Sequence, residues 1–147
     1  MADDRRSTAT EVVYNCLRVV ASWVYLQHGL QKYGMLGGFG PNGGSVHFPS
    51  LMGWAGLIEI TCGVLILIGL FTRVVAFIAS GEMAVAYFMA HAPHGGPLFT
   101  IHNHGETPAI LSLLFLYICL VGPGAYSLDA IIASARRPAI VPSPQAT

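Results

Sequence analysis

The chain has 147 residues, of which 54% are apolar and only 10% are charged. Seven basic residues balance seven acidic ones, and the mean hydropathy is +0.61. Soluble domains carry about 25% charged residues, so these few charges cannot cover a soluble globule of this length. The composition argues against a cytosolic enzyme, a disordered chain and a basic nucleic-acid-binding protein. It favours one domain that places much of its surface in lipid.

Four apolar stretches approach the length of about 20 residues that a transmembrane helix needs. They cover residues 12–33, 51–70, 74–90 and 107–121. Glu59 and Glu82 are the single charges of the second and third stretches, and Arg18 interrupts the first. Because a helix satisfies its own backbone hydrogen bonds in lipid, we predict an all-α fold, an integral membrane four-helix bundle.

Residues that favour helix ends flank these stretches. Thr8 and Glu11 have the spacing of a capping box before the first helix. Ser50 and Thr72 are expected to cap the second and third helices. Pro108 suits the first turn of the fourth, where proline is tolerated.

The C-terminal part of the chain is predicted to leave the bilayer. Apolar residues on one helical face predict a short amphipathic helix over residues 127–136, lying on the membrane surface. Residues 138–147 contain three prolines and no periodic pattern, so we expect a disordered cytoplasmic tail. Residues 1–137 are then one transmembrane domain.

Basic residues set the predicted orientation. One side of the four spans would carry the five arginines outside the helices: Arg5, Arg6, Arg73, Arg136 and Arg137. The other side would carry Lys32 and all six histidines. Since positive charge is retained in the cytoplasm, both termini are predicted to be cytoplasmic and the His-rich loop is predicted to lie outside.

Polar residues of the first helix recur at three-, four- and seven-residue steps and so share one face. They are Tyr14, Arg18, Tyr25, His28 and Lys32. Charges in a bilayer usually face the bundle interior and have partners. We therefore predict a polar seam in which Arg18 reaches Glu82 and Tyr25 lies level with Glu59. His28, Lys32 and Glu106 are predicted to gather near the outer end.

Two interpretations of this seam stay open. Interhelical charge pairs often serve packing alone. A buried carboxylate can instead exchange protons or contact a quinone. On the second interpretation Glu59, Glu82 and Arg18 are candidate catalytic residues, and Tyr25, His28, Lys32 and Glu106 form a candidate quinone site.

Histidines and cysteines are the residues of this chain that could serve metal binding or redox chemistry. The four histidines nearest the fourth helix are His91, His94, His102 and His104, and such imidazoles could bind Zn or Cu on the outer face. The alternative is that they are solvated. The three cysteines form no C-x-x-C pair, so buried structural thiols are expected.

Several sequence pieces occur in an order that resembles a known family. They are Arg18, residues 28–32, 59–63 and 67–73, Glu82 with Met83, and residues 104–106 and 122–129. In this order the chain resembles the DoxX family of small four-helix membrane proteins. The resemblance implies a bacterial or archaeal cytoplasmic (inner) membrane protein. The family is named after a subunit of a thiosulfate:quinone oxidoreductase, and other relatives look like partners of redox enzymes.

The leading functional hypothesis is a membrane subunit of a redox system that interacts with the quinone pool, with electrons supplied by a partner protein. One alternative is a non-enzymatic anchor or assembly partner of another protein. A second is an outer-face Zn or Cu binding protein that uses the His-rich loop. A homodimer or heteromer is expected, because the short helices expose small residues.

Overall fold

The computed structural model describes residues 7–40 and 42–136, and all regular structure in these residues is helical. The α-helices are α1 (Thr8–Lys32), α2 (Leu51–Ile68), α3 (Thr72–Ala86), α4 (Thr100–Asn103), α5 (Glu106–Val121) and α6 (Leu128–Ala135). A π-helical turn at Tyr87–His91 and a 3-10 turn at Ala92–His94 continue α3. The predicted all-α class is confirmed. The predicted tail at residues 138–147 lies outside the described residues.

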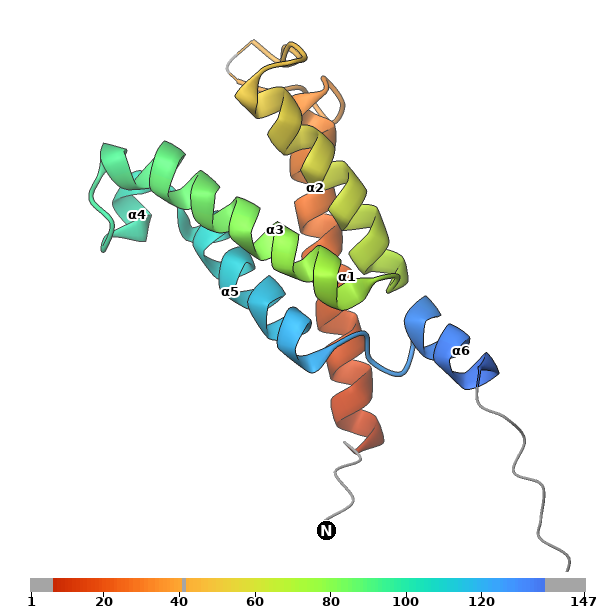
Figure 1. The fold of residues 1–147 in the computed structure, drawn as a ribbon. Helices are drawn as coiled ribbons and strands as arrows, with labels where there is room; N and C mark the ends of the chain where they lie inside the picture. The colour runs from red at the N-terminus through yellow and green to blue at the C-terminus, as the bar shows by residue number, and fades with distance from the viewer. Residues whose placement is uncertain (1–6, 41, 137–147) are drawn as a thin grey trace, which may run out of the picture.

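The four long helices form two antiparallel pairs (Figure 1). The α1 helix packs along α2, the α3 helix packs along α5, and α2 also contacts α3. Where the pairs cross, the buried core is built from Tyr14, Ala21, Tyr25, Cys62, Ile66, Val75, Ala76, Ala79, Met83, Leu111, Phe115 and Ile118. The first described residues of α1 and the α6 helix lie at the same end of the molecule.

Glycines bring α1 and α2 into close contact. A Cβ atom on Gly29 would lie 2.9 Å from the Gly56 carbonyl oxygen, and one on Gly63 would lie 3.0 Å from the Leu26 Cβ. Small residues at such crossings allow helix backbones to approach closely. This approach brings the polar side chains of α1 and α2 within reach of each other.

The outward faces of the long helices are apolar. Large exposed side chains on them include Val13, Val20, Trp23, Phe77, Leu113 and Leu120. By length and composition, Leu51–Ile68 and Thr72–His94 can each cross a membrane, and Glu106–Val121 is a shorter apolar helix. Monomeric soluble proteins rarely expose so much contiguous apolar surface.

Two predicted helix caps were wrong, and one predicted helix start is shifted by a single residue. The Ser7 side chain, rather than a Thr8 capping box, accepts the hydrogen bond from the Thr10 N–H, at 3.3 Å. Thr72 is the first residue of α3 and caps nothing; the cap comes from Asp129 of α6. The α5 helix begins one residue early, at Glu106. Ser50 caps α2 as predicted, accepting from the Gly53 N–H at 3.0 Å.

Candidate functional site

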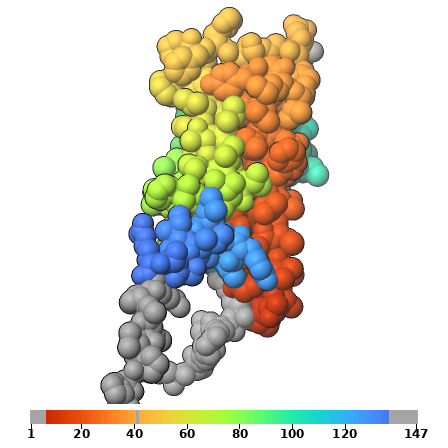
Figure 2. Space-filling view, turned by 90° about the vertical axis from the view of Figure 1, so that its right-hand side faces the viewer, coloured from red at the N-terminus to blue at the C-terminus, as the bar shows by residue number. Residues whose placement is uncertain are grey.

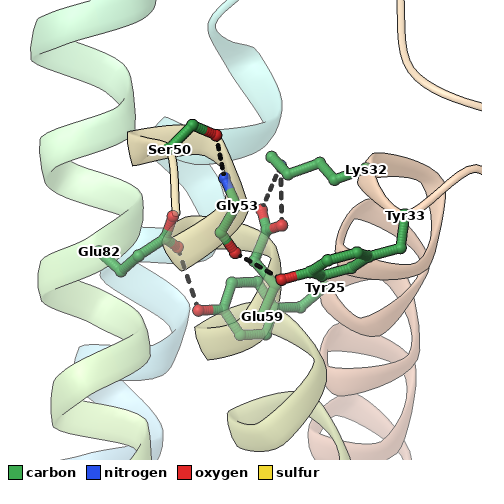
Figure 3. Close-up of polar contacts among 7 residues, drawn as sticks. All are labelled: Tyr25, Lys32, Tyr33, Ser50, Gly53, Glu59 and Glu82. Atoms are coloured by element: carbon green, nitrogen blue, oxygen red, sulfur yellow. Dashed lines mark hydrogen bonds and ion pairs between the residues drawn. The ribbon is translucent and has the colours of Figure 1, made fainter. Parts of the chain in front are cut away.

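A buried ion pair joins α1 to α2. The Lys32 Nζ lies 2.8 and 2.7 Å from the two carboxylate oxygens of Glu59. The Glu59 side chain is 1% exposed and the Lys32 side chain 12% exposed. Gly56 leaves room for the Lys32 stem, since a Cβ there would lie 3.2 Å from the Lys32 Cβ. The lysine therefore reaches across from α1 to neutralise a carboxylate of α2 that has left water (Figure 3).

A second polar contact joins α1 to α3. The Tyr25 hydroxyl donates a hydrogen bond to the Glu82 Oε2 at 3.0 Å. Tyr25 is fully buried, and its ring packs edge-on against Phe115 of α5, with ring centroids 4.9 Å apart. The phenol is thus fixed at the crossing of the two helix pairs and aims its hydroxyl at one acceptor.

These two contacts form one cluster, which we call the polar cluster: Tyr25, Lys32, Glu59 and Glu82. In Figure 3 its side chains come from three helices and point toward one another. Glu59 lies eight residues into α2 and Glu82 ten residues into α3, about 12 and 15 Å along their axes. The cluster therefore sits well inside the apolar length of these helices.

The polar cluster holds one cation and two carboxyl groups. The ammonium of Lys32 is shared by both oxygens of Glu59, whereas the phenol of Tyr25 donates to Glu82. Glu82 is half-buried, and its second oxygen accepts no hydrogen bond from the described residues. Glu82 is thus the carboxyl group of the cluster that has no cation partner among the described residues.

Arg18 does not reach Glu82, so that predicted pair was wrong. Its guanidinium donates to the carbonyl oxygens of Ile66, Leu67 (2.9 Å) and Tyr126 (2.7 Å). The last carbonyls of a helix lack intrahelical partners and carry partial negative charge, so the end of α2 attracts the cation. Arg18 is 2% exposed and joins α1, α2 and the segment before α6, away from the polar cluster.

The other predicted seam positions are only partly brought together. Tyr25 was expected level with Glu59, but the Glu59 carboxylate binds Lys32, and the Tyr25 hydroxyl donates to Glu82. His28 and Glu106 are both half-buried, and the side chain of neither forms a hydrogen bond with a described residue. Counting depth along parallel helix axes does not predict which side chains meet, because the two helix pairs cross.

The four candidate metal-ligating histidines serve separate contacts. The His91 Nδ1 lies 3.0 Å from the Asn103 carbonyl oxygen, and the His94 Nδ1 lies 3.0 Å from that of Ala90. His102 packs edge-on against the Phe99 ring, and His104 occupies the left-handed cap position after α4. Among residues 7–40 and 42–136, no group of three or more His, Cys, Asp or Glu side chains could hold a metal ion.

Sequence reasoning missed Asn103, which organises this loop. The side chain is 4% exposed. It donates to the Gly96 carbonyl at 2.9 Å and accepts from the Gly105 N–H at 2.8 Å. Tyr87 adds a hydrogen bond to the Pro97 carbonyl at 2.6 Å. An asparagine among glycines and prolines is a turn signal, but that signal does not identify the Gly96 carbonyl or the Tyr87 hydroxyl as its partners.

Asp129 is the second missed residue. Its carboxylate accepts from the backbone N–H groups of Phe71 (3.0 Å) and Thr72 (2.9 Å) and from the Thr72 hydroxyl (2.9 Å). Partial burial alone would raise the pKa of Asp129, but these hydrogen bonds and the nearby Arg18 charge lower it below its ordinary value. A residue of α6 thus caps the start of α3.

Comparison with known proteins gives a consistent family. A family model described as DoxX matches residues 14–92. A Haemophilus influenzae protein described as uncharacterized is 44% identical over 119 residues, covering 77% of this chain and 85% of that protein. An uncharacterized membrane protein of Mycobacterium tuberculosis is 29% identical over 126 residues, covering 78% of this chain and 77% of that protein.

A third relative carries a functional name. The "Putative oxidoreductase CatD" of Bacillus subtilis is 27% identical over 124 residues, covering 82% of this chain and 87% of that protein. No solved structure matches this chain significantly. The family match includes every residue of the polar cluster. The chain therefore belongs to the DoxX family and is a membrane protein.

Proposed function

We propose that this protein is an integral membrane subunit of a redox system and that its polar cluster contacts the headgroup of a membrane quinone. One observation carries the proposal: inside apolar helices, the ion pair of Lys32 and Glu59 lies beside a carboxyl group, Glu82, that has no cation partner among the described residues. The name of the Bacillus subtilis relative supports a redox role.

The chemistry of quinones fits such a cluster. Reduction of a quinone to a quinol takes two electrons and two protons, so a site in the bilayer needs a group that exchanges protons. Glu82 supplies that group, and its hydrogen bond from Tyr25 holds it in place. The ion pair of Lys32 and Glu59 keeps a fixed dipole beside it. A partner protein supplies or takes the electrons.

The proposal includes four membrane crossings. The outward residues of α1 and α5 are apolar, as in Val13, Val20 and Leu113, although α1 carries a polar stripe on its inner side. Each charge of that stripe has a partner in the bundle: Arg18 binds carbonyl groups and Lys32 binds Glu59. Pairing of this kind is how transmembrane helices hold charges.

Topology follows from the described basic residues. Arg73 binds carbonyl groups at the end of α5, next to Gly122, whose carbonyl accepts from Tyr14 in the first part of α1. Arg136 ends α6, which lies toward the end of the molecule where α1 begins. We therefore place that end, with both termini, in the cytoplasm of a bacterial or archaeal cell. The loop with His91 and His94 then lies outside.

Labelling of single cysteines with a membrane-impermeant maleimide tests this orientation. Positions near His94 should react in intact cells, and positions near Arg136 should react only after lysis. The reverse pattern contradicts the orientation.

Quinone binding by the purified protein tests the proposal. The protein is placed in phospholipid nanodiscs, and decylubiquinone binding is followed by quenching of tryptophan fluorescence. Glu82→Gln should weaken binding by about tenfold or more because it removes the carboxyl group that faces the headgroup, and Tyr25→Phe should do so because it removes the hydrogen bond that holds Glu82 in place. Glu106→Gln is the matched control, since it makes the same chemical change outside the cluster. Equal binding in all four proteins contradicts the assignment of the site.

A further inference from the structure

The segment between α1 and α2 folds back over the end of this helix pair. Figure 2 shows it in orange and amber, at the end of the molecule opposite α6. Lys32 is the last residue of α1, and its carbonyl oxygen accepts a hydrogen bond from the Val46 N–H at 2.8 Å. The Tyr33 hydroxyl donates to the Gly53 carbonyl oxygen at the start of α2, at 2.7 Å. The returning chain is therefore tied to the helix ends beside the buried ion pair of Lys32.

Phe39 of this segment places an aromatic ring at the lysine. The Lys32 Nζ lies 5.7 Å from the centroid of the Phe39 ring, a distance at which the face of the ring attracts a cation. The ammonium thus has two neighbours that favour its charge, the ring and the Glu59 carboxylate. The Lys32 side chain is only 12% exposed, although it lies in the last turn of its helix.

A tight turn fixes the position of Phe39. Its N–H donates to the Gly44 carbonyl oxygen at 2.7 Å. Gly38 has a φ of +74°, and a Cβ atom there would overlap the Gly43 carbonyl group. Glycine adopts this conformation without steric cost. At Gly44, by contrast, a Cβ atom would meet nothing within 4 Å. The backbone of the turn therefore determines where the ring lies.

The ion pair has little exposure apart from the side that faces this segment. Glu59 is 1% exposed, so a water-soluble molecule that comes from this end of the helix pair meets Lys32 before it meets the carboxylate. The Phe39 ring lies against that same ammonium. Removal of the ring would open the one partly exposed member of the ion pair.

From these contacts we infer that the segment between α1 and α2 closes the polar cluster to water-soluble molecules at this end, and that Phe39 is the residue that covers Lys32. A ligand of the cluster then approaches from another side. This statement about the ligand rests on the proposed function, whereas the covering of Lys32 does not.

The lysine content of the chain makes the covering measurable. Lys32 is the only lysine, so its acylation by a water-soluble succinimidyl ester is followed by mass spectrometry of the peptide that contains it. The protein is held in nanodiscs, in which the reagent reaches both faces. Phe39→Ala should raise the acylation rate of Lys32 by about tenfold. Phe39→Tyr keeps the ring and should react at the wild-type rate.

Matched variants separate the loss of the ring from a general loosening of the segment. Phe48→Ala removes another exposed ring of the segment, which packs against Trp54 with centroids 4.7 Å apart, and it should leave the rate unchanged. Gly38→Ala should displace Phe39 and raise the rate, whereas Gly44→Ala should not. Helical circular dichroism verifies that each variant is folded.

The inference is overturned if Phe39→Ala reacts at the wild-type rate or if Phe48→Ala raises the rate equally. A comparison of folded wild type with wild type unfolded in urea and dodecyl sulfate needs no variant that folds. Equal acylation rates in the two states would also overturn the inference. No quinone is present in these samples, so failure of this test and failure of quinone binding are separate results.

Discussion

Removing the lysine of the buried ion pair should destabilise the protein by several kcal/mol. In Lys32→Met the Glu59 carboxylate, 1% exposed, loses both of its charged hydrogen bonds. Breaking a buried pair at one partner costs about 3–5 kcal/mol. The loss of unfolding free energy is limited because Glu59 can take up a proton and become neutral. For a glutamate with a solution pKa of about 4.3, protonation at pH 7 costs about 3.7 kcal/mol, which lies within the range of about 3–5 kcal/mol.

A double-mutant cycle isolates this interaction. Combining Lys32→Met with Glu59→Gln removes both charges, so the double variant should be more stable than the sum of the single changes predicts, by at least about 2 kcal/mol. The cost of Lys32→Met should also shrink by about 1.4 kcal/mol for each pH unit between 7 and 5, as protonation of Glu59 becomes cheaper.

The assay is reversible unfolding in mixed detergent and dodecyl sulfate micelles, followed by tryptophan fluorescence and helical circular dichroism. Glu106→Gln serves as the control for removing a carboxylate that has no ion-pair partner among the described residues. A loss below about 1 kcal/mol for Lys32→Met, or additive effects in the double variant, refutes the reasoning that the pair is buried and mutually dependent.

Three further variants test other parts of the structure. Asp129→Asn should lower the free energy of unfolding by about 0.5–2 kcal/mol, as loss of a helix cap does. Because the pKa of Asp129 in the folded protein lies below the ordinary 3.8, the stability difference between wild type and variant should be full above about pH 4 and shrink as the pH falls through the lowered pKa. A stability difference that grows in acid would contradict this sign. Gly29→Ala should destabilise by about 1–3 kcal/mol through overpacking against Gly56, measured by the same unfolding assay, whereas Gly81→Ala, where a Cβ meets nothing within 4 Å, should not. Asn103→Ala should increase amide hydrogen exchange in residues 92–105 while leaving α1 and α2 protected; unchanged exchange there would show that the side chain does not hold the loop.

Sequence reasoning predicted the long helices because their signal is local. Apolar runs and capping residues such as Ser50 depend on neighbours within a few positions, and the polar stripe of α1 follows from helical periodicity. The boundaries agree within a few residues for the four long helices and for α6. The four-residue α4 was missed because it contains less than two turns of periodic pattern.

Partner choice within the polar cluster could not be predicted in the same way. Counting depth along parallel helices predicted that Arg18 reaches Glu82 and that Tyr25 lies level with Glu59, without identifying Lys32 and Glu82 as the partners. The two helix pairs cross at core residues such as Ala76, Ala79 and Phe115, and this crossing shifts the levels. Arg18 binds backbone carbonyls, which every residue possesses and which no sequence pattern marks. The four charged or phenolic residues that do meet were nevertheless all predicted members of the seam.

The central claim is that the polar cluster of Tyr25, Lys32, Glu59 and Glu82 meets a quinone. Its most direct test is the quinone content of lipid extracts from the protein purified gently out of its native membrane, compared with the surrounding membrane lipid. We expect enrichment in wild type toward one quinone per chain, retained in Glu106→Gln and reduced by about tenfold in Glu82→Gln. A quinone-to-lipid ratio in wild type no higher than that of the surrounding membrane would contradict it.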